Sequence, residues 1–208
     1  MSGAGATASG GDGSGGAPGG VVGPVPAGRD PGPYDRLRRR VLWSLPTGLY
    51  VLGTRDGPGR NLMTVSWVTQ VAVAPKLVAV SVEAGARSHA LLVGGRVFAL
   101  SVLARGDRAL VRHFAKPVGE DEIAVDAVSG VGTMRGQPVR AGTTGAPVLA
   151  VAVAWLDCEV RHTVALGSHT LFVGEVVDCD ERTAPAGEER ADDTGVLRME
   201  DTRMNYGG

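Results

Sequence analysis

The chain has 208 residues, which is enough for one domain but short for two. Its 21 basic residues nearly balance 22 acidic ones, so the net charge is -1 and nucleic-acid binding driven by charge is disfavoured. No apolar run approaches the roughly 18 residues of a membrane-spanning helix, and the N-terminus lacks the apolar core of a secretion signal. With two cysteines, no disulfide framework is expected, and the sequence predicts a cytoplasmic protein without nucleic-acid or membrane partners.

Residues 1–33 differ from the rest of the chain in composition. Gly, Pro, Ala and Ser dominate this stretch, so it has too little apolar surface to form a core. A GxGxxG pattern occurs at Gly11, Gly13 and Gly16, but it lacks the preceding strand and following helix of a dinucleotide-binding turn. The sequence therefore predicts a disordered tail over residues 1–33 and a single domain over residues 34–208.

An amphipathic helix is predicted to begin at Tyr34. The apolar residues Tyr34, Leu37, Val41 and Leu42 recur at helical spacing, and Pro46 marks the limit of the helix. The other face carries Arg36, Arg38, Arg39 and Arg40. We interpret this arginine run as the solvated side of the helix rather than as a site for a polyanion.

The chain after Pro46 has the pattern of a β protein. Val-rich segments bounded by Gly or Pro predict strands within residues 47–55, 62–73, 76–84, 96–104, 146–164 and 170–180. Two short helices are predicted over residues 88–95 and 107–115, the second with Asp107 as its N-cap. Six or more strands without long crossover helices predict a closed or partly closed, mainly β barrel.

The common catalytic and metal-binding motifs are absent from the sequence. The four histidines lack metal-ligand spacing, no CxxC pair occurs, and neither a GxSxG elbow nor a P-loop lysine is present. Cys158 and Cys179 lie in apolar, strand-like segments, so we interpret both as buried, inert thiols. No metal site is expected.

Polar residues interrupt the apolar segment NLMTVSWVTQ. Asn61, Thr64 and Ser66 could meet the edge of a ligand that the backbone approaches closely. The alternative is ordinary strand alternation, in which these side chains face water. The spacing alone does not decide between the two.

The segment SVEAGARSHALL runs from a strand through a glycine turn into a helix. Free N–H groups at a helix start, together with Arg87 and Ser88, would suit a phosphate. The alternative is a helix start capped by Ser88.

Two further candidates lie toward the C-terminus. The Gly167–Ser168 turn presents His169 at the entrance of a hairpin strand, where a histidine is more often an ordinary surface residue. Asn205 and Tyr206 precede the two final glycines. Local patterns lead no further than a β-barrel with an anion pocket.

Taken together, these segments resemble the flavin reductase-like family of FMN-binding split barrels. The resemblance covers about residues 35 to 208. It rests on NLMTVSWVTQVAVAPKLVAVSVEAGARSHALL, GRVFALSVLARGDRALVRHFA, AWLDCEV, GSHTLFVGEVV and MNYGG. The resemblance implies a mainly β fold, a Greek-key-type six-stranded split barrel with short flanking helices.

The resemblance also implies an activity. In such a family the barrel forms a homodimer that holds FMN, or in some members FAD, at the subunit interface. NADH or NADPH reduces this flavin, and the reduced flavin then serves a partner monooxygenase or reduces iron. The chain is therefore expected to be an oxidoreductase, an NAD(P)H-dependent FMN reductase.

Site residues follow from the resemblance position by position. The set that lines the isoalloxazine is Asn61, Met63, Thr64, Val65, Ser66 and Trp67. The set beneath the ribityl chain is Ser81, Val82 and Glu83. The phosphate turn is matched by Arg87 and Ser88, and an aromatic residue near the flavin by Phe114. The catalytic residue that faces the nicotinamide is matched by His169, and Tyr206 lies in the segment that contacts NAD(P)H.

One position departs from the family pattern. Members often have Gly-Asp-His where this chain has Gly167, Ser168 and His169, so a carboxylate that could orient the imidazole is missing. Two other hypotheses stay open, a non-enzymatic FMN-binding electron carrier or sensor and a scaffold with an empty pocket. The sequence does not distinguish NADH from NADPH, or FMN from FAD.

Overall fold

The structure is a computed structural model that describes residues 23–181 and 195–202, in two compact units that divide after Leu45. The first unit contains helix α1 (Pro31–Leu42), which begins three residues before the start predicted at Tyr34. Asp30 is the N-cap and accepts a hydrogen bond from the backbone N–H of Gly32, and a proline occupies the first helical position. The predicted helix is therefore present, but it both begins and ends three residues earlier than the segment 34–45 that the sequence indicated.

The arginine run lies along α1 as the sequence predicts. Asp35 pairs with Arg38 and Arg39, one turn further along the helix, and Arg36 and Arg40 are exposed. No residue of α1 is buried, and Leu37 and Val41 on its apolar face are exposed.

The second unit is built on a seven-stranded antiparallel sheet. Its members are β1 (Tyr50–Asp56), β2 (Gly59–Val65), β3 (Val68–Val73), β4 (Lys76–Glu83), β5 (Val97–Val102), β10 (Ala154–Ala165) and β11 (His169–Glu181). They are ordered β2-β1-β5-β10-β11-β4-β3. The two edge strands, β2 and β3, are consecutive in the chain and are joined only by Ser66 and Trp67.

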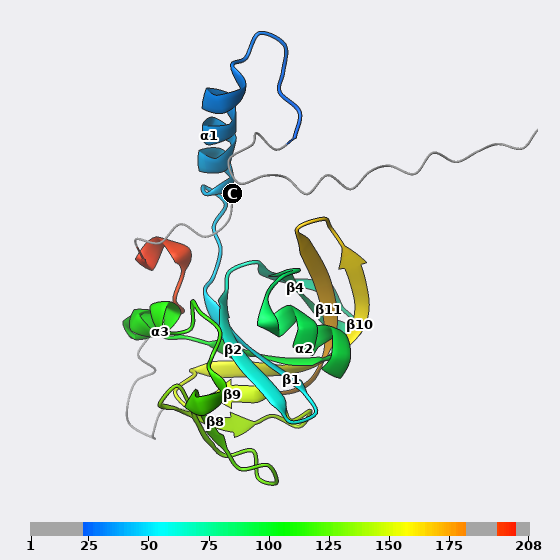
Figure 1. The fold of residues 1–208 in the computed structure, drawn as a ribbon, viewed down its shortest axis with the longest axis vertical. Helices are drawn as coiled ribbons and strands as arrows, with labels where there is room; N and C mark the ends of the chain where they lie inside the picture. Colours follow the sequence, from blue (N-terminus) through cyan, green and yellow to red (C-terminus); the bar gives the residue numbers. More distant parts are fainter. Residues whose placement is uncertain (1–22, 182–194, 203–208) are drawn as a thin grey trace, which may run out of the picture. The chain divides into compact units, whose positions relative to one another are not determined.

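This connection explains why the sheet forms a barrel. A two-residue link spans about 10 Å, whereas a flat seven-stranded sheet would be roughly 29 Å wide. The sheet must therefore curl until its edges approach each other, as the ribbon shows (Figure 1). The predicted mainly β, split-barrel fold is confirmed, although the segment 62–73 forms two strands where one was predicted.

A second, four-stranded sheet packs beside the barrel. It is ordered β6 (Ile123–Val125), β7 (Gly132–Met134), β8 (Gln137–Ala141) and β9 (Pro147–Leu149). The first three of these strands were not predicted. The predicted strand 146–164 divides into β9 and β10, because a turn interrupts the apolar run without any Gly or Pro to mark it.

The two faces of the barrel wall bury different cores. One core lies between the sheets and includes Val51, Leu62, Phe114 and Leu149. The other fills the barrel and includes residues from the same strands, Leu52 and Val65 among them. Because successive strand residues alternate between faces, neighbours in β1 and β2 serve different cores.

Short helices complete the second unit. They are α2 (Arg87–Gly95), η1 (Arg105–Asp107), α3 (Arg108–His113), η2 (Glu120–Glu122) and η3 (Met199–Asp201). Leu92 anchors α2 in the barrel core. Asp107 is the N-cap of α3 as predicted, although its side chain makes no capping hydrogen bond. None of the helices within residues 23–181 and 195–202 is both long and apolar enough to cross a membrane.

The prediction that both thiols are buried is half wrong. Cys158 is fully buried in the barrel core, where burial raises the pKa of its thiol to about 12. Cys179 is exposed, because it lies among the last three residues of β11, none of which is covered. The apolar run in the sequence extends beyond the part of the strand that the core covers.

Candidate active site

A buried polar network joins the β1–β2 hairpin to the start of α2. The strand register places Thr54 directly opposite Asn61. The Asn61 Nδ2 donates a hydrogen bond to Ser88 Oγ over 2.8 Å, and Thr54 Oγ1 donates to the same oxygen over 3.3 Å. All three side chains are at most 1% exposed. The network therefore fixes the first turn of α2 against the hairpin that it covers (Figure 1).

Asn61 and Thr64 of β2 also bind α3 and the segment that follows it. Asn61 Oδ1 accepts a hydrogen bond from the backbone N–H of Val118 over 2.9 Å. Thr64 donates through Oγ1 to Val111 O over 2.8 Å and through its backbone N–H to Phe114 O over 3.0 Å. Asn61, Thr64 and Ser66 are all buried, so the alternative in which these residues face water is wrong.

Along one edge of β2, backbone N–H and C=O groups are available for partners outside the sheet. The strand pairs only with β1 in its sheet, and an edge strand leaves alternate N–H and C=O groups for other partners. Thr64 uses one such N–H to bind Phe114 O. The pyrimidine edge of an isoalloxazine carries donors and acceptors that match backbone groups of this kind.

The turn between β4 and α2 is open on its outer side. The N–H of Ala86 donates to Glu83 O over 3.0 Å, and no atom lies within 4 Å of the position that a side chain on Gly85 would take. Ala86, with extended backbone, is the N-cap of α2. The reading of Ser88 as the N-cap is therefore wrong, since its fully buried hydroxyl binds Asn61 and supports the turn from beneath.

Arg87 spans the gap between this turn and the segment after α3. Its Nη1 donates to Val118 O over 3.1 Å, and its Nη2 forms an ion pair with the Glu120 carboxylate. The Glu120 side chain is 85% exposed, whereas that of Arg87 is 28% exposed. An incoming anion would therefore compete with a solvated carboxylate for this guanidinium.

An aromatic pair lies at the same end of the barrel. The rings of Trp67 and His169 have centroids 4.8 Å apart at an angle of 50°, and Trp67 is 41% exposed. His169 is the first residue of β11 and pairs in register with Glu83, the last residue of β4. The predicted position of His169 at a hairpin entrance is thus correct, and the structure brings together Trp67, Glu83 and His169.

Ser168 gives His169 a partner of its own. Ser168 Oγ lies 3.0 Å from His169 Nδ1, within hydrogen-bond distance. The backbone oxygen of Ser168 accepts from the N–H of Ala84 over 2.9 Å, which ties the hairpin to the end of β4. The position where the family often has aspartate therefore carries a neutral hydroxyl that can still orient the imidazole.

Most of the other predicted residues are covered by protein rather than open to solvent. Phe114 is fully buried in the core between the sheets, and Val65 and Val82 belong to the barrel core. Met63 and Ser81 are half-buried. Tyr206 lies outside the described residues. Within residues 23–181 and 195–202, no group of three His, Cys, Asp or Glu side chains could hold a metal ion.

Sequence reasoning missed three residues of this region, Thr54, Val118 and Glu120. The turn sequence DGPG at residues 56–59 could have fixed the hairpin register and placed Thr54 opposite Asn61. No sequence signal points to Val118 or Glu120, because both reach the site through contacts distant in the chain.

The residues present fit a flavin. An edge strand offers backbone groups, Trp67 and His169 offer partly exposed rings, and Arg87 lies beside an open glycine turn. These are the partners that a planar heterocycle with a phosphate-bearing chain requires.

Comparison with known proteins identifies the family. The flavin reductase like domain matches residues 42–201. An NADH-dependent FAD reductase from Streptomyces globisporus is 36% identical over 160 residues, which cover 74% of this chain and 81% of the relative. The chain belongs to the flavin reductase-like family, as the resemblance predicts.

Two solved structures agree with this assignment. An NADH:FAD oxidoreductase from Streptomyces globisporus C-1027 matches with a TM-score of 0.58 at 35% identity, over 72% of this chain and 84% of that one. The flavin reductase of styrene monooxygenase from Pseudomonas putida S12 matches with a TM-score of 0.56 at 30% identity, over 69% of this chain and 86% of that one.

Proposed function

We propose that this protein is an NAD(P)H-dependent flavin reductase that supplies reduced flavin to a partner monooxygenase. The observation that carries the proposal is the partly exposed Trp67–His169 ring pair beside the β4–α2 turn. The family resemblance assigns Trp67 to the flavin and His169 to the nicotinamide, so the contact between the two rings supports the proposal.

The residues at the open end bind and orient rather than react. A flavin held here would supply the redox chemistry, as the carrier of electrons from a reduced nicotinamide to an acceptor. Hydride transfer needs no protein acid or base, so the contribution of His169 is to position the donor. When the Ser168 hydroxyl donates to Nδ1, the neutral imidazole carries its hydrogen on Nε2, where it can donate to a nicotinamide amide.

The exposed Trp67 and the β2 backbone act on the flavin itself. The indole, which is 41% exposed, would cover one side of a bound flavin and shield it from water. Backbone N–H groups aimed at the pyrimidine edge would stabilise the negative charge that reduction places there. The supporting network of Thr54, Asn61 and Ser88 holds these groups in place without touching the ligand.

We infer FMN as the preferred flavin. Arg87 and the open turn at Gly85 suit a terminal phosphate monoester, and the resemblance assigns this turn to the phosphate. FAD stays a competing flavin, since a relative is named for it. The names of the relatives favour NADH over NADPH as the donor.

We also infer a homodimer. The family resemblance builds the flavin cleft from two subunits, and the apolar residues Leu37, Val41 and Leu45 are exposed in this single chain. Analytical ultracentrifugation should show a dimer. A monomer that binds FMN tightly would contradict this inference.

The function is tested by steady-state oxidation of NADH and NADPH with FMN, FAD and riboflavin as acceptors. The proposal predicts multiple turnovers with FMN, coupled to oxygen uptake or to cytochrome reduction by released flavin. Tight flavin binding without turnover by either nucleotide would favour an electron carrier or sensor instead. A protein that binds none of the three flavins would favour a scaffold.

A further inference from the structure

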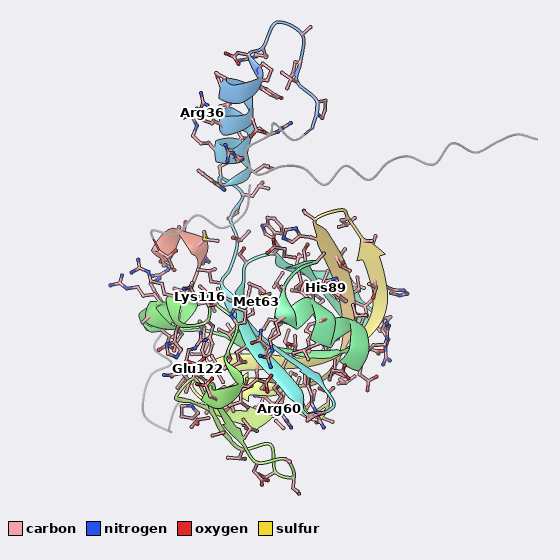
Figure 2. The ribbon with its side chains drawn as sticks, in the orientation of Figure 1. Arg36, Arg60, Met63, His89, Lys116 and Glu122 are labelled. Atoms are coloured by element: carbon pink, nitrogen blue, oxygen red, sulfur yellow. The ribbon has the colours of Figure 1, made fainter. Side chains whose placement is uncertain are left out.

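Two arginines lie directly opposite each other at the end of the β1–β2 hairpin. The register pairs Arg55 with Arg60, one position beyond the Thr54–Asn61 pair. Like charges in directly opposed strand positions repel each other. Figure 2 shows Arg60 near the tip of the hairpin and Met63 further along the same strand.

The arginine pair is on the opposite face of the hairpin from the candidate active site. Alternation along β1 and β2 puts Arg55 and Arg60 on the face of Val51 and Leu62, which belong to the core between the sheets. Thr54 and Asn61 face α2 instead. The two arginines therefore belong to a separate place in the fold.

A cavity of about 330 Å³ lies on this face. Its lining consists of the two arginines and two loops, residues 127–130 and 141–145. This volume is at the lower end of the roughly 300–1,000 Å³ of small-molecule pockets, which suits a small charged fragment rather than a whole dinucleotide.

The two guanidinium groups have donors to spare. Arg55 Nε donates to Gly57 O and Arg60 Nη1 donates to Pro58 O, each over 3.0 Å. Within residues 23–181 and 195–202, neither arginine forms an ion pair. In that part of the chain, every fully buried side-chain nitrogen has a hydrogen-bond partner. The remaining guanidinium nitrogens of Arg55 and Arg60 have none there, so they are not fully buried and have access to the cavity that the two side chains line.

Burial raises the free-energy cost of the positive charge on Arg60, which has no acidic partner in the described part of the chain. Arg60 is only 7% exposed, and its burial, followed by the charge of Arg55, lowers the pKa of its guanidinium. An arginine nevertheless stays protonated in proteins, so the pair keeps two positive charges. Such a pair is stabilised by an anion that both groups can reach.

Three acidic residues beside the two loops already accept hydrogen bonds. Asp157 accepts hydrogen bonds from the N–H and hydroxyl of Thr144, and Asp178 accepts from the hydroxyl of Thr143. Asp126 accepts from Ser129 within its own turn. None of the three carboxylates lines the cavity.

Gly145 makes room for one of the guanidinium groups. Its φ is +83°, and a side-chain carbon at this position would overlap Arg55 Nη1. A glycine therefore satisfies both the backbone conformation and the close approach of the arginine.

We propose that the cavity between Arg55, Arg60 and loops 127–130 and 141–145 binds a phosphate group, as a free phosphate or as the phosphate of a nucleotide. Two forked guanidinium groups with free N–H donors match the geometry of phosphate oxygens. The site is independent of the flavin site and does not rest on the proposed reductase activity.

The test is calorimetric titration of the full chain with inorganic phosphate, pyrophosphate and AMP at constant ionic strength, with adenosine as the uncharged control. Saturable binding of the three anions is expected, and it should weaken about tenfold or more in Arg55→Gln and in Arg60→Gln. Arg108→Gln, which removes an exposed arginine elsewhere, should leave binding unchanged. AMP binding more tightly than phosphate would assign the group to a nucleotide, and equal binding would assign it to free phosphate.

An Arg87→Ala variant separates this site from the phosphate turn of the flavin site. Binding that survives in Arg87→Ala and is lost in Arg55→Gln supports the proposal. Binding that is lost in Arg87→Ala and kept in both Arg55→Gln and Arg60→Gln overturns it, as does the absence of saturable binding in the unaltered chain. If Arg60→Gln fails to fold, Arg55→Gln, in which the half-buried member of the pair is changed, decides the outcome.

Discussion

At the scale of single residues, His169 carries the most specific functional expectation. Its ring packs against Trp67 and its Nδ1 lies beside the Ser168 hydroxyl, so its position is fixed from two sides. His169→Ala should slow flavin reduction by about 10- to 100-fold, because the nicotinamide loses its orientation while the flavin keeps its own contacts. Stopped-flow reduction of bound FMN measures this rate. The matched control is His162→Ala, which removes an exposed histidine on the same hairpin. An unchanged rate in His169→Ala would show that the nicotinamide binds elsewhere.

Arg87 and Glu120 make a second prediction at this scale. Arg87→Ala should weaken FMN by about tenfold or more, because a charge-assisted bond to the phosphate is lost, and should change riboflavin affinity little. Glu120→Gln should strengthen FMN binding, since it releases the guanidinium from a competing carboxylate. Fluorescence titration with both flavins checks this. Equal weakening of FMN and riboflavin in Arg87→Ala would show that the turn does not hold the phosphate.

The sequence predicts where a residue lies along a strand or turn better than it predicts the hydrogen bonds of its side chain. The hairpin entrance at His169 follows from the Gly167–Ser168 turn, and the structure confirms it. Asn61 and Ser88 were singled out correctly as unusual, yet their hydrogen bonds join strands to a helix across 27 residues of chain. No local pattern contains such a contact, so the sequence could not show that both are buried supports.

At the scale of elements, Arg135 holds the segment 113–118 in place through hydrogen bonds, and this segment supports the site. This residue at the β7–β8 turn donates to the carbonyl oxygens of His113, Lys116 and Pro117, and to the Glu122 carboxylate. Figure 2 labels Lys116 and Glu122 at this junction. The residues that Arg135 binds lie directly before Val118, whose N–H donates to Asn61 Oδ1. The small sheet therefore positions β2 through a chain of hydrogen bonds.

The ion pair between Glu122 and Arg135 predicts a pH dependence of stability. The Arg135 guanidinium, followed by the N–H of Gly119, lowers the pKa of Glu122 to about 2 from its ordinary value of 4.5. The carboxylate therefore contributes its full stabilisation above the unfolded-state pKa and loses it as the pH falls toward about 2. Urea unfolding midpoints should decline less steeply between about pH 5 and 2 in Glu122→Gln than in the unaltered chain. The exposed Asp180→Asn is the control. The same decline in Glu122→Gln and in the unaltered chain would contradict this role.

The elements that the sequence predicts are those with enough residues to show a period. The strands of the barrel alternate over six residues or more, so Val-rich segments locate them. Strands β6 and β7 have three residues each, too few for a pattern to appear. The break at Ser66 and Trp67 has no Gly or Pro to mark it, and the closure of the sheet rather than a strong local turn signal requires it.

At the scale of the whole molecule, we expect the N-terminal stretch to be dispensable for the barrel. Among the residues that the structure describes, the cores of the second unit include none before Leu49, and the family domain matches from residue 42. Deletion of residues 1–33 should therefore leave the melting temperature and the FMN affinity unchanged. Circular dichroism and flavin titration measure both. A deletion that continues through Val51 and removes fully buried side chains should destabilise the protein, and a large loss of stability in the shorter deletion would show that the first unit contributes to the fold.

In the reaction that we propose, a nicotinamide reduces a flavin at the open end of the barrel in the second unit. The most direct measurement is anaerobic mixing of the flavin-loaded protein with NADH, and separately with NADPH, followed by flavin absorbance. The account predicts rapid bleaching by at least one nucleotide, followed by repeated turnover when free flavin and oxygen are supplied. A protein that binds flavin tightly and is bleached by neither nucleotide would contradict it.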